Sequence, residues 1–527
     1  MKNNWLIAFS LLLNSLMLSA QWSTDLTQNL PIANDSRISN VHYANNGYYF
    51  TWEDGSNGIY THKVIRLNAD GTNNWTQAMD AHNHPLGSST LSLQHSFVDP
   101  SGNFIRVSSY NTDIGQSSCA NKISENGSQL WNGGAGIVFN DIAMGAYLSP
   151  NNNLYVVSGD SLFKLNASGQ IQWKSIIDPS HTNNQKCSIL ENSDGSVTVA
   201  YFVPGQFNPT YGSYYVSKFD NAGTRTTSGS HQIAASSSIF YTPTFFKSNS
   251  AGDHFFIYHD TNTGTSYLQK IVGDQPQITG LGSPLDGTVN SKYVAACMHS
   301  DTLEVLYKYN WNSFDEAGLK HQTIDLNTMS FAYPSGNILY DDLTTNVQPL
   351  QNCMVNFNDD FAFLLLDNVS KKISLKVMHQ GSISETFDMC ATSSDKGLAA
   401  MSSFDILNSN SQQLVAFFED YRQGATVAPI NVAQNYTVTS TGLEQAKFQS
   451  EIHSFPNPSN AFVIFEIPSN YANAVLTVLS LDGKEVLKTN LNKGSSKIDI
   501  QSLASGIYLM KINANNQTLY QEKFIKE

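Results

Sequence analysis

The stretch YYFTWED at residues 48–54, with VIRLNADG at 64–71 and Trp75 behind it, decides the fold of this chain. An apolar strand ends in acidic residues, a second strand ends in an Asn/Asp-x-Gly turn, and a tryptophan follows four residues after the glycine. Glycine fits such a turn because it adopts positive φ at no steric cost. The stretch therefore predicts paired short strands whose tryptophan packs against a neighbouring unit.

The same unit returns along residues 21–450, where successive turn glycines lie 56, 42 and 54 residues apart. Periods of this length, built from short strands, are typical of propeller blades, since a single four-stranded blade cannot bury both of its faces. The prediction is an all-β chain with a β-propeller of seven or eight blades. The turn recurs at Gly127 before Trp131, at Gly169 before Trp173 and at Gly223, and the acidic strand recurs at 414–422.

Eight blades is the number that the repeats favour, and seven fits nearly as well. The alternative architecture is a set of tandem β-sandwiches. A helical domain is not expected, because no segment sustains apolar residues at helical spacing. The expected blades centre on 40–80, 90–137, 141–178, 186–233, 240–285, 290–330, 350–390 and 398–440.

The sequence also predicts how the ring closes. Residues 21–26 (QWSTDL) resemble 74–79 (NWTQAM) and 172–177 (QWKSII), whereas the last repeat lacks a Gly-x-x-x-Trp strand of its own. We therefore expect residues 21–32 to pair with the segment near 414–438. Such pairing removes the open sheet edges that invite aggregation.

Charge separates the chain into two parts. The whole chain carries 29 Lys+Arg and 43 Asp+Glu, a net charge of −14, which argues against nucleic acid as a partner. Residues 451–527 hold seven lysines and seven acidic residues and are neutral. The acidity therefore belongs to residues 21–450.

The first 20 residues have the order of a secretory signal peptide. A short start with Lys2 precedes the apolar run from Trp5 to Leu18, and small residues end at Ala20. The alternative is a membrane anchor, but the run is shorter than the roughly 20 residues that cross a bilayer. We expect cleavage after Ala20 and no membrane-spanning segment in the mature chain.

The last 74 residues, from Ser454, predict a separate small β-domain. Residues 462–467 and 497–500 alternate in polarity, Asp482-Gly483 suits a hairpin turn, and 506–512 and 519–524 form a final strand pair. Seven short strands would make a sandwich of the immunoglobulin-like class.

Four ordered motifs in residues 452–527 closely resemble the type A C-terminal sorting domain of the type IX secretion system of Bacteroidetes. The resemblance implies passage to the periplasm and then across the outer membrane, with the type IX machinery as partner, to the medium or the cell surface. The motifs read Phe455-Pro456-Asn457-Pro458, Ser480-Leu481-Asp482-Gly483-Lys484, Leu503-Ala504-Ser505-Gly506-Ile507-Tyr508 and Lys523-Phe524-Ile525-Lys526. Carried onto this sequence, the sorting residues are Pro456, Asn457, Pro458, Asp482, Gly483, Lys484, Gly506, Ile507, Tyr508 and Lys523.

These signals divide the chain into a signal peptide at 1–20, a propeller at 21–445, a linker at 446–453 and a sorting domain at 454–527. The repeats of the body also resemble the W-x-D and D-x-G…W units of many exported Bacteroidetes propellers. That resemblance implies no single activity.

Acidic pairs are the first candidates for chemistry, since hydrolases use two carboxylates with separated pKa values. Neighbouring residues on a strand point to opposite faces, so turn or structural roles are the expectation for them. The pairs are Glu53-Asp54, Asp341-Asp342, Asp359-Asp360 and Glu419-Asp420.

Metal and cofactor sites have weak support. His82 and His84 form an H-x-H, but a proline follows and no third ligand is placed by spacing. Calcium is an alternative at the Asp/Asn-rich turns 70–73 and 358–360, which lack the full EF-hand pattern. We therefore expect no cofactor and no catalytic or metal residue. Five scattered cysteines, Cys119, Cys187, Cys297, Cys353 and Cys390, are expected as buried thiols, with one or two disulfides as the alternative.

The leading hypothesis is a non-enzymatic, exported binding or adhesion module whose blade-top loops meet a glycan, a peptide or a surface protein. Two alternatives stay open: a secreted hydrolase with its site at the propeller axis, and a structural part of a gliding or adhesion apparatus. Aromatic residues offer a carbohydrate face, although strand aromatics more often belong to blade cores. They are Tyr211, Tyr214, Tyr215, Tyr307, Tyr309, Trp311 and Phe314.

Overall fold

The computed structural model divides the chain into two compact units, Met1–Thr437 and Val438–Glu527. Every named element in the described residues is a strand. The structure describes Trp22 and residues 30–527 except 35, 55–60, 81–88, 113–114, 133–135, 182–184, 206–210, 235–238, 241–244, 286–290, 310–317, 342–346, 358–359, 368–371, 380, 391–403, 411–412, 421–429, 438–452, 456–458, 468–473, 481–483, 492 and 515–516.

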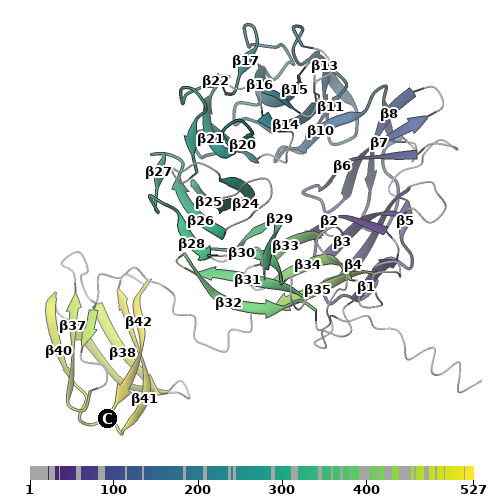
Figure 1. Cartoon of the computed structure of the whole chain (residues 1–527). Coiled ribbons are helices and arrows are strands. Elements are labelled where there is room, and N and C mark those ends of the chain that lie inside the picture. Colours follow the sequence, from purple (N-terminus) through teal and green to yellow (C-terminus); the bar gives the residue numbers. More distant parts are fainter. Residues whose placement is uncertain are drawn as a thin grey trace, which may run out of the picture. The chain divides into compact units, whose positions relative to one another are not determined.

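The first unit, called the body below, is a ring of antiparallel sheets, and the strand that starts each meander faces the centre (Figure 1). Consecutive strands pair with each other, so each sheet is a meander. The first three sheets contain β2 (Ser36–Ala44), β3 (Gly47–Asp54), β4 (Thr61–Asn68) and β5 (Met79–Asp80); β6 (Ser89–Val98), β7 (Phe104–Thr112), β8 (Gly115–Ile123) and β9 (Ile137–Phe139); and β10 (Ala143–Leu148), β11 (Leu154–Ser158), β12 (Ser161–Leu165) and β13 (Ile171–Ile176).

A ten-stranded sheet follows, in which β18 (Ile239–Phe240) pairs with strands of two successive meanders. These meanders contain β14 (Gln185–Glu191), β15 (Val197–Pro204), β16 (Tyr211–Phe219) and β17 (His231–Gln232); and β19 (Phe245–Ser248), β20 (His254–Asp260), β21 (Thr265–Val272), β22 (Gln275–Pro276) and β23 (Ser283–Pro284). The next two sheets contain β24 (Lys292–His299), β25 (Thr302–Tyr309), β26 (Gly318–Asp325), β27 (Ser330–Phe331) and β28 (Asn337–Tyr340); and β29 (Val347–Phe357), β30 (Asp360–Asp367), β31 (Ile373–His379) and β32 (Ser382–Asp388).

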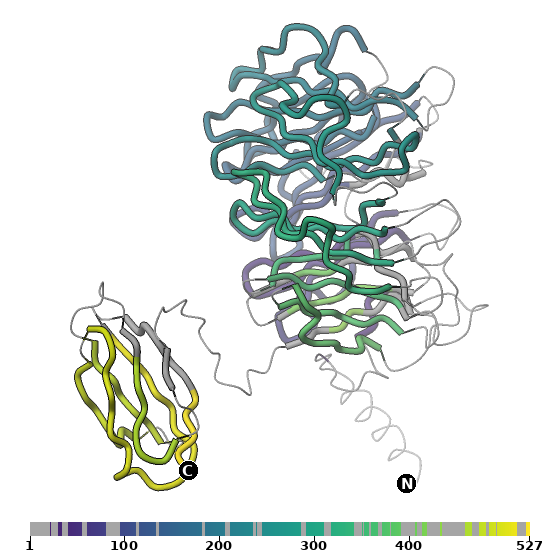
Figure 2. The backbone as a smooth tube through the Cα atoms, turned by 60° about the vertical axis from the view of Figure 1, so that its left-hand side comes forward, coloured from purple at the N-terminus to yellow at the C-terminus, as the bar shows by residue number. Residues whose placement is uncertain are grey.

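The last sheet of the body closes the ring with a strand from the other end of the sequence. It contains β33 (Phe404–Asn410), β34 (Gln413–Asp420), β35 (Ile430–Thr437) and, at its outer edge, β1 (Leu30–Asn34). Leu30 lies opposite Ala433, and Asn34 lies opposite Ile430. In Figures 1 and 2 the purple start of the body therefore lies beside its green end. The predicted closure is confirmed for Leu30–Asn34, and residues 21 and 23–29 lie outside the described part.

Each tryptophan after a glycine turn contacts the corresponding turn of the next sheet. The indole Nε1 of Trp75 donates to the Glu125 carbonyl oxygen at 2.7 Å, and that of Trp173 donates to the Asn221 carbonyl oxygen at 3.0 Å. Trp131 makes the same bond to Ala167 at 3.3 Å. The repeated Gly-x-x-x-Trp unit therefore links one sheet to the next around the ring.

The core of the body lies between neighbouring sheets. Strand β3 sends Tyr48 and Phe50 toward the closing sheet, where the rings of Phe50 and Phe417 are 5.0 Å apart. The residue between them, Tyr49, packs the other way and stacks on Phe104 of the second sheet at 5.4 Å. A strand buried on both faces needs apolar side chains at successive positions, which explains the run YYF.

The second unit, called the tail below, is a pair of sheets around one buried cluster. Tyr508 lies in this cluster, and its hydroxyl donates to the Ala504 carbonyl oxygen at 2.8 Å. One sheet contains β36 (His453–Phe455), β37 (Phe462–Ile467) and β40 (Gly494–Asp499). The other has the order β39 (Glu485–Leu491), β38 (Ala474–Ser480), β41 (Gly506–Ala514) and β42 (Gln517–Lys526).

The architecture confirms the predicted all-β class and the propeller form of the body. Strand pairing carries this conclusion, since successive meanders form a ring closed by β1. The number of blades and the immunoglobulin-like class of the tail stay predictions. No helix among the described residues has the length and apolar character needed to cross a bilayer.

Candidate functional site

A pocket of about 410 Å³ lies in the body where three turns meet at the ends of β2, β6 and β10. Each turn joins the inner strand of a sheet to its second strand, so the pocket borders the inner part of the ring. It is lined by Tyr43, Ala44, Asn45, Val98, Asp99, Pro100, Tyr147, Leu148, Ser149 and Pro150.

Two tyrosines give the pocket its aromatic walls. Tyr43 is half-buried, and its ring lies 5.0 Å from that of Tyr48. Tyr147, also half-buried, stacks on Tyr155 with ring centroids 6.5 Å apart. Burial, together with the charge of Glu191, raises the pKa of Tyr147, so its phenol stays protonated. The two rings are fixed by packing and still reach solvent.

The turn behind Asn45 is held by hydrogen bonds to the first two sheets. Arg66 Nη2 donates to the Asn45 carbonyl oxygen at 3.2 Å and also contacts Glu125 Oε1 at 3.2 Å. The amide of Asn45 donates to the Ser101 carbonyl oxygen at 3.1 Å. The amide side chain is therefore oriented at the pocket rim before any ligand arrives.

Asp99 forms the floor of the pocket and is paired. Its side chain is fully buried, and Oδ2 lies 2.6 Å from Lys122 Nζ. Burial alone would raise the pKa of this carboxyl, but hydrogen bonds from Lys122 and Asn103 and the lysine charge hold it below its ordinary value. Lys122 also donates to the Ala167 carbonyl oxygen at 3.2 Å, which links the floor to the third sheet.

Glu191 holds the third turn from the next sheet. Its Oε1 accepts from the Tyr155 hydroxyl at 2.6 Å and from Asn153 Nδ2 at 3.0 Å, and its Oε2 accepts from Asn151 Nδ2 at 2.9 Å. Lys164 lies 3.9 Å from the same carboxylate. All three walls are thus fixed by contacts between sheets.

Sequence reasoning missed the residues of this pocket. Two sequence signals point to them. First, each inner strand ends in an aromatic residue followed by an apolar and a polar one, and the aromatic residues are Tyr43, Phe97 and Tyr147. Second, a positively charged residue lies five positions before each turn glycine. The second signal comprises Arg66, Lys122, Lys164 and Lys218.

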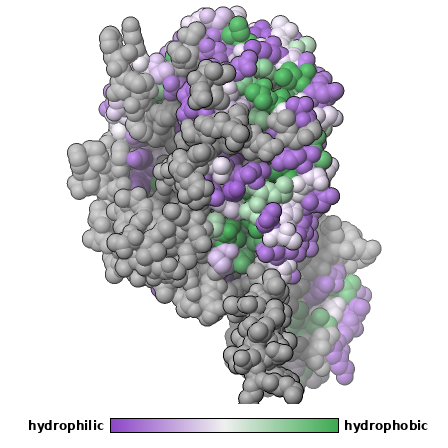
Figure 3. Space-filling view, turned by 90° about the vertical axis from the view of Figure 1, so that its right-hand side faces the viewer, coloured by the Kyte–Doolittle hydropathy of each residue, from purple (hydrophilic) through white to green (hydrophobic). Residues whose placement is uncertain are grey.

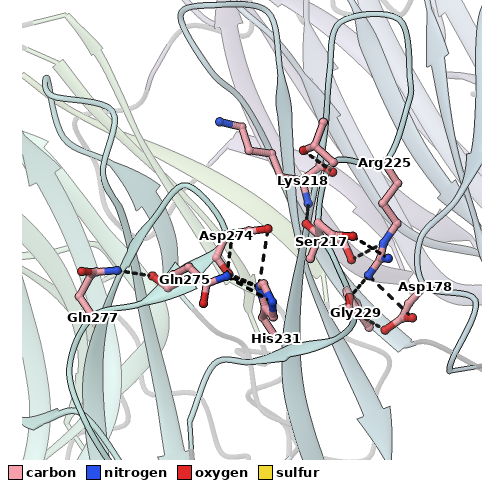
Figure 4. Close-up of polar contacts among 12 residues, drawn as sticks. Asp178, Ser217, Lys218, Arg225, Gly229, His231, Asp274, Gln275 and Gln277 are labelled. Atoms are coloured by element: carbon pink, nitrogen blue, oxygen red, sulfur yellow. Dashed lines mark hydrogen bonds and ion pairs between the residues drawn. The ribbon is translucent and has the colours of Figure 1, made fainter.

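A second polar cluster lies between the third and fourth sheets, around Asp178 (Figure 4). Its fully buried carboxylate accepts from Tyr201 at 2.6 Å and from Ser230 at 2.5 Å, with His181 at 2.9 Å and Arg225 at 3.8 Å. Burial opposes ionisation, yet hydrogen bonds led by Ser230 lower the pKa of Asp178. Ser230 and His181 both bond to the Asp178 carboxylate. In a catalytic triad the serine hydroxyl bonds to the histidine instead, so this cluster has a structural role.

Nearby, His231 ties the two meanders of the ten-stranded sheet together. Its Nδ1 lies 3.0 Å from the Asp274 carbonyl oxygen, and the Gln275 amide donates to the same ring (Figure 4). Around the other junctions, too, buried polar side chains pair across sheets. They fix the sheets relative to one another rather than opening a site.

The described members of the acidic pairs are not among the residues that line the pocket. Glu53 is buried and lies in the electrostatic field of Arg106, a fully buried arginine that sequence reasoning did not single out. Arg106 contacts His62 Nδ1 at 2.6 Å and donates to Ser108 at 3.2 Å. A structural role for the Glu53-Asp54 pair stays a prediction. Asp342 and Asp359 lie outside the described residues, as do the side chains of Glu419 and Asp420.

The candidate metal residues have separate outcomes. His82 and His84 lie outside the described residues. The turn at Asp70 uses its own carboxylate internally, since Oδ1 accepts from the Thr72 amide at 2.9 Å and from the Thr72 hydroxyl at 2.6 Å. Within the described part of the chain, no group of three or more His, Cys, Asp or Glu side chains is arranged to hold a metal ion.

All five cysteines are free and buried, as predicted. Burial raises the pKa of Cys119 to about 12, so the thiol is unreactive at neutral pH. The aromatic candidates divide between core and surface: Tyr214 and Tyr307 are core residues, Tyr211 is exposed, and Tyr215 and Tyr309 are half-buried. The first two therefore confirm the favoured assignment of strand aromatics to blade cores, and Trp311 and Phe314 lie outside the described residues.

The described residues of three sorting motifs lie at one end of the sheet formed by β39, β38, β41 and β42. Ser480 lies opposite Tyr508, and Tyr508 lies opposite Phe524. Ser459, next to the first motif, donates its amide to the Ile525 carbonyl oxygen at 3.0 Å. Pro456, Asn457, Pro458, Asp482 and Gly483 lie outside the described residues, while Lys484, Gly506, Ile507 and Lys523 are placed at or beside this end.

Residues 453–527 match the family model described as the secretion system C-terminal sorting domain. This part of the chain is therefore a sorting domain of type IX secretion, and it addresses the protein to the cell surface or the medium. A comparison with curated protein sequences returns no match.

A comparison with solved structures returns matches of low identity and low TM-score. PorZ of Porphyromonas gingivalis, described as an essential surface component of the type-IX secretion system, is 12% identical, with a TM-score of 0.34 over 94% of this chain and 70% of that one. The β-propeller domain of the Trilobed protease from Pyrococcus furiosus is 8% identical, with a TM-score of 0.39 over 68% and 97%. A protein of unknown function from Dyadobacter fermentans is 10% identical, with a TM-score of 0.38 over 78% and 97%.

Proposed function

We propose that this protein is an exported binding module whose body takes a carbohydrate ligand outside the cell, at the surface or in the medium. Residues 1–20 would serve as the leader, 21–445 as the propeller, 446–453 as the linker and 454–527 as the sorting domain. The sorting domain supplies the destination, and the three-turn pocket supplies the binding surface. An adhesion role follows if the ligand belongs to another cell or to a matrix.

The pocket carries the proposal through its two tyrosine walls. Aromatic rings stack on the C–H faces of sugars, and amides and hydroxyls at a rim bond to sugar hydroxyls. Tyr43 and Tyr147 provide the rings, and the exposed Asn45 provides a rim amide of that kind. Because contacts between sheets already fix these turns, little conformational entropy is lost on binding.

The carboxylate content of this pocket supports ligand binding rather than glycoside hydrolysis. A glycosidase mechanism needs two carboxylates in different protonation states. Among the residues lining the pocket the carboxylate is that of Asp99, and its charge is engaged by Lys122 at 2.6 Å. The alternative of a hydrolase at the propeller axis stays a prediction, tested by assaying the same protein on polysaccharides.

The test uses the secreted full-length protein on a glycan array, followed by calorimetry with the best ligand. Tyr43→Ala and Tyr147→Ala should each weaken binding about fivefold or more, since each lost stacking contact is worth about 1 kcal/mol or more. Tyr211→Ala removes an exposed tyrosine elsewhere on the body and should leave affinity unchanged. Absence of any glycan ligand, or equal loss in all three variants, would overturn the proposal, and selective binding of peptides would redirect it to another ligand class.

A further inference from the structure

The tail carries an exposed apolar area in addition to its buried core. In the sheet of β39, β38, β41 and β42, alternate residues such as Val478, Met510 and Phe524 are buried inward. The residues between them point outward, because side chains alternate along a strand. Ile507 and Ile525 are outward residues with exposed fractions of 39% and 38%, and they lie directly opposite each other on β41 and β42.

This outward area continues beyond the isoleucine pair. Leu479 lies opposite Leu509 on the same face, and both are half-buried. Val486 of β39 is 38% exposed. A domain with a complete core does not require large apolar groups at these positions, so their presence marks an interaction surface.

Lysines surround the apolar area. Lys511 and Lys523 occupy outward positions on β41 and β42, and Lys488 occupies one on β39 beside Glu485, 3.6 Å away. At the described outward positions of the four strands lysines outnumber acids, since Glu485, opposite Leu479, already pairs with Lys488, although residues 451–527 hold equal numbers of lysines and acids. The neutral tail is therefore locally basic on this face.

We propose that this face, defined by Leu479, Val486, Leu509, Ile507 and Ile525 with Lys511 and Lys523, is where the tail docks on a protein of the export machinery that presents an apolar centre with acidic residues around it. Interfaces of this kind combine an apolar core with a charged rim that sets specificity. A second copy of the tail does not fit, because two such faces would bring lysines against lysines.

The meeting of the motifs supports this choice of face. Ile507 and Ile525 belong to two of the four motifs, and Ser480 of a third lies opposite Tyr508. Ser459 also accepts from the Glu527 amide at 3.0 Å, so it covers the outer edge of β42 at this end. Because that edge is covered, the partner cannot pair with β42 as an added strand and must contact the side chains on the sheet face. The surface therefore combines residues from several motifs and forms only when the tail is folded.

The experiment expresses the full-length chain in a bacterium that has a type IX system and measures the exported fraction. Ile507→Thr with Ile525→Thr, and Lys511→Glu with Lys523→Glu, should each lower export at least tenfold. Threonine keeps strand propensity at exposed positions, so folding is preserved. The control, Ile464→Thr with Lys497→Glu, changes the outward side of the other sheet, where Lys497 lies over the Phe462 ring, and should export normally.

Protease resistance and circular dichroism of each purified variant separate docking from folding. Normal export of both face variants would overturn the proposal, and so would an equal loss in the control. Restored export of the lysine variant by acid-to-lysine changes in one machinery component would support it. Vesicles with anionic lipids form a second arm: if the face variants lose vesicle binding but are exported normally, the face meets a membrane and the proposal is wrong. Glycan affinity of the body should not change in any variant.

Discussion

The indole Nε1 of Trp22 donates to the carbonyl oxygen of Ala69 at 2.6 Å, across 47 residues of sequence. The same bond joins Trp75 to Glu125 and Trp173 to Asn221 inside the ring. Trp22 therefore performs, from the start of the body, the task that the internal repeats perform for their neighbours. Its backbone amide also donates to Asp70 at 3.2 Å.

Replacing Trp22 by alanine should destabilise the body by about 2–4 kcal/mol, since the change removes a hydrogen bond and an edge contact with Tyr48 at 5.5 Å. Trp22→Phe keeps the ring and should cost only about 1 kcal/mol. Denaturant unfolding measures both changes. Ile176→Ala, at an exposed position, serves as the control. A Trp22→Ala variant as stable as that control would show that the contact contributes nothing.

Gly223 should tolerate alanine less well than Gly229, although both have positive φ, 86° and 88°. A Cβ on Gly223 would lie 2.5 Å from the Trp173 ring, whereas nothing lies within 4 Å of a Cβ on Gly229. Backbone strain of about 1 kcal/mol is common to both substitutions, and the clash adds roughly 1–3 kcal/mol at Gly223. Thermal unfolding of the two variants checks the difference, which would vanish if the tryptophan moved away freely.

Lys122 should matter far more to stability than an exposed lysine in a similar ion pair. Lys122→Met leaves the buried Asp99 carboxylate uncompensated, at a cost of about 3–5 kcal/mol, and should also weaken ligand binding in the pocket above it. Adding Asp99→Asn should recover part of the loss. The control is Lys372→Met, whose partner Asp388 lies 3.0 Å away at an exposed site, where the cost is below about 1 kcal/mol. Equal costs would contradict the structural role of the floor.

Acid should unfold the body between about pH 6.5 and 4. Burial lowers the pKa of His254 and His259 from 6.5 to about 4. In that window the unfolded chain binds protons that the folded chain does not, so stability falls as the pH falls, by up to about 3 kcal/mol for each histidine. Stability is complete above pH 6.5, where both states are neutral.

His254→Gln should flatten this dependence, because glutamine takes up no proton in the unfolded state. The measurement is the melting temperature at a series of pH values for the two proteins. Loss of the bonds to Ser248 and Thr198 lowers stability at pH 7, so the slope between pH 7 and 4.5 is the quantity to compare. An unchanged slope would mean that His254 is protonated in the folded protein.

The repeat sequence predicted the ring because its signals are local. A glycine that needs positive φ, such as Gly169, and a tryptophan four residues later mark each turn directly in the sequence. Closure of the ring was also predictable. The start of the body offers an extra strand, and the last repeat lacks one, so the first can complete the second. The register of that strand was not predictable, because residues 21–32 carry no turn signal to fix it.

The pocket and the buried arginine were beyond such reasoning. Tyr43 and Tyr147 are more than 100 residues apart in sequence, and only the packing of three sheets brings their turns together. Arg106 lies in a strand of ordinary composition, and its complete burial depends on His62 from the neighbouring sheet. The sequence of one repeat does not contain the information on what the next repeat places opposite it.

The surface seen in Figure 3 mixes hydrophilic and hydrophobic residues, with small separate hydrophobic areas on its coloured part. Large exposed apolar residues of the body, such as Val138 and Ile176, lie on outer strands. An exported protein with scattered apolar residues stays monomeric more readily than one with a continuous patch.

The pairing of β1 with β35 sets a schedule for biogenesis. A chain that leaves the ribosome from its first residue must keep Leu30–Asn34 without its native partner until some 400 further residues have been made and have reached the same compartment. A chaperone that shields β1 would thus be needed until β35 has been made. A chain truncated before Ile430 would form an open ring with an unpaired, aggregation-prone sheet edge at each end.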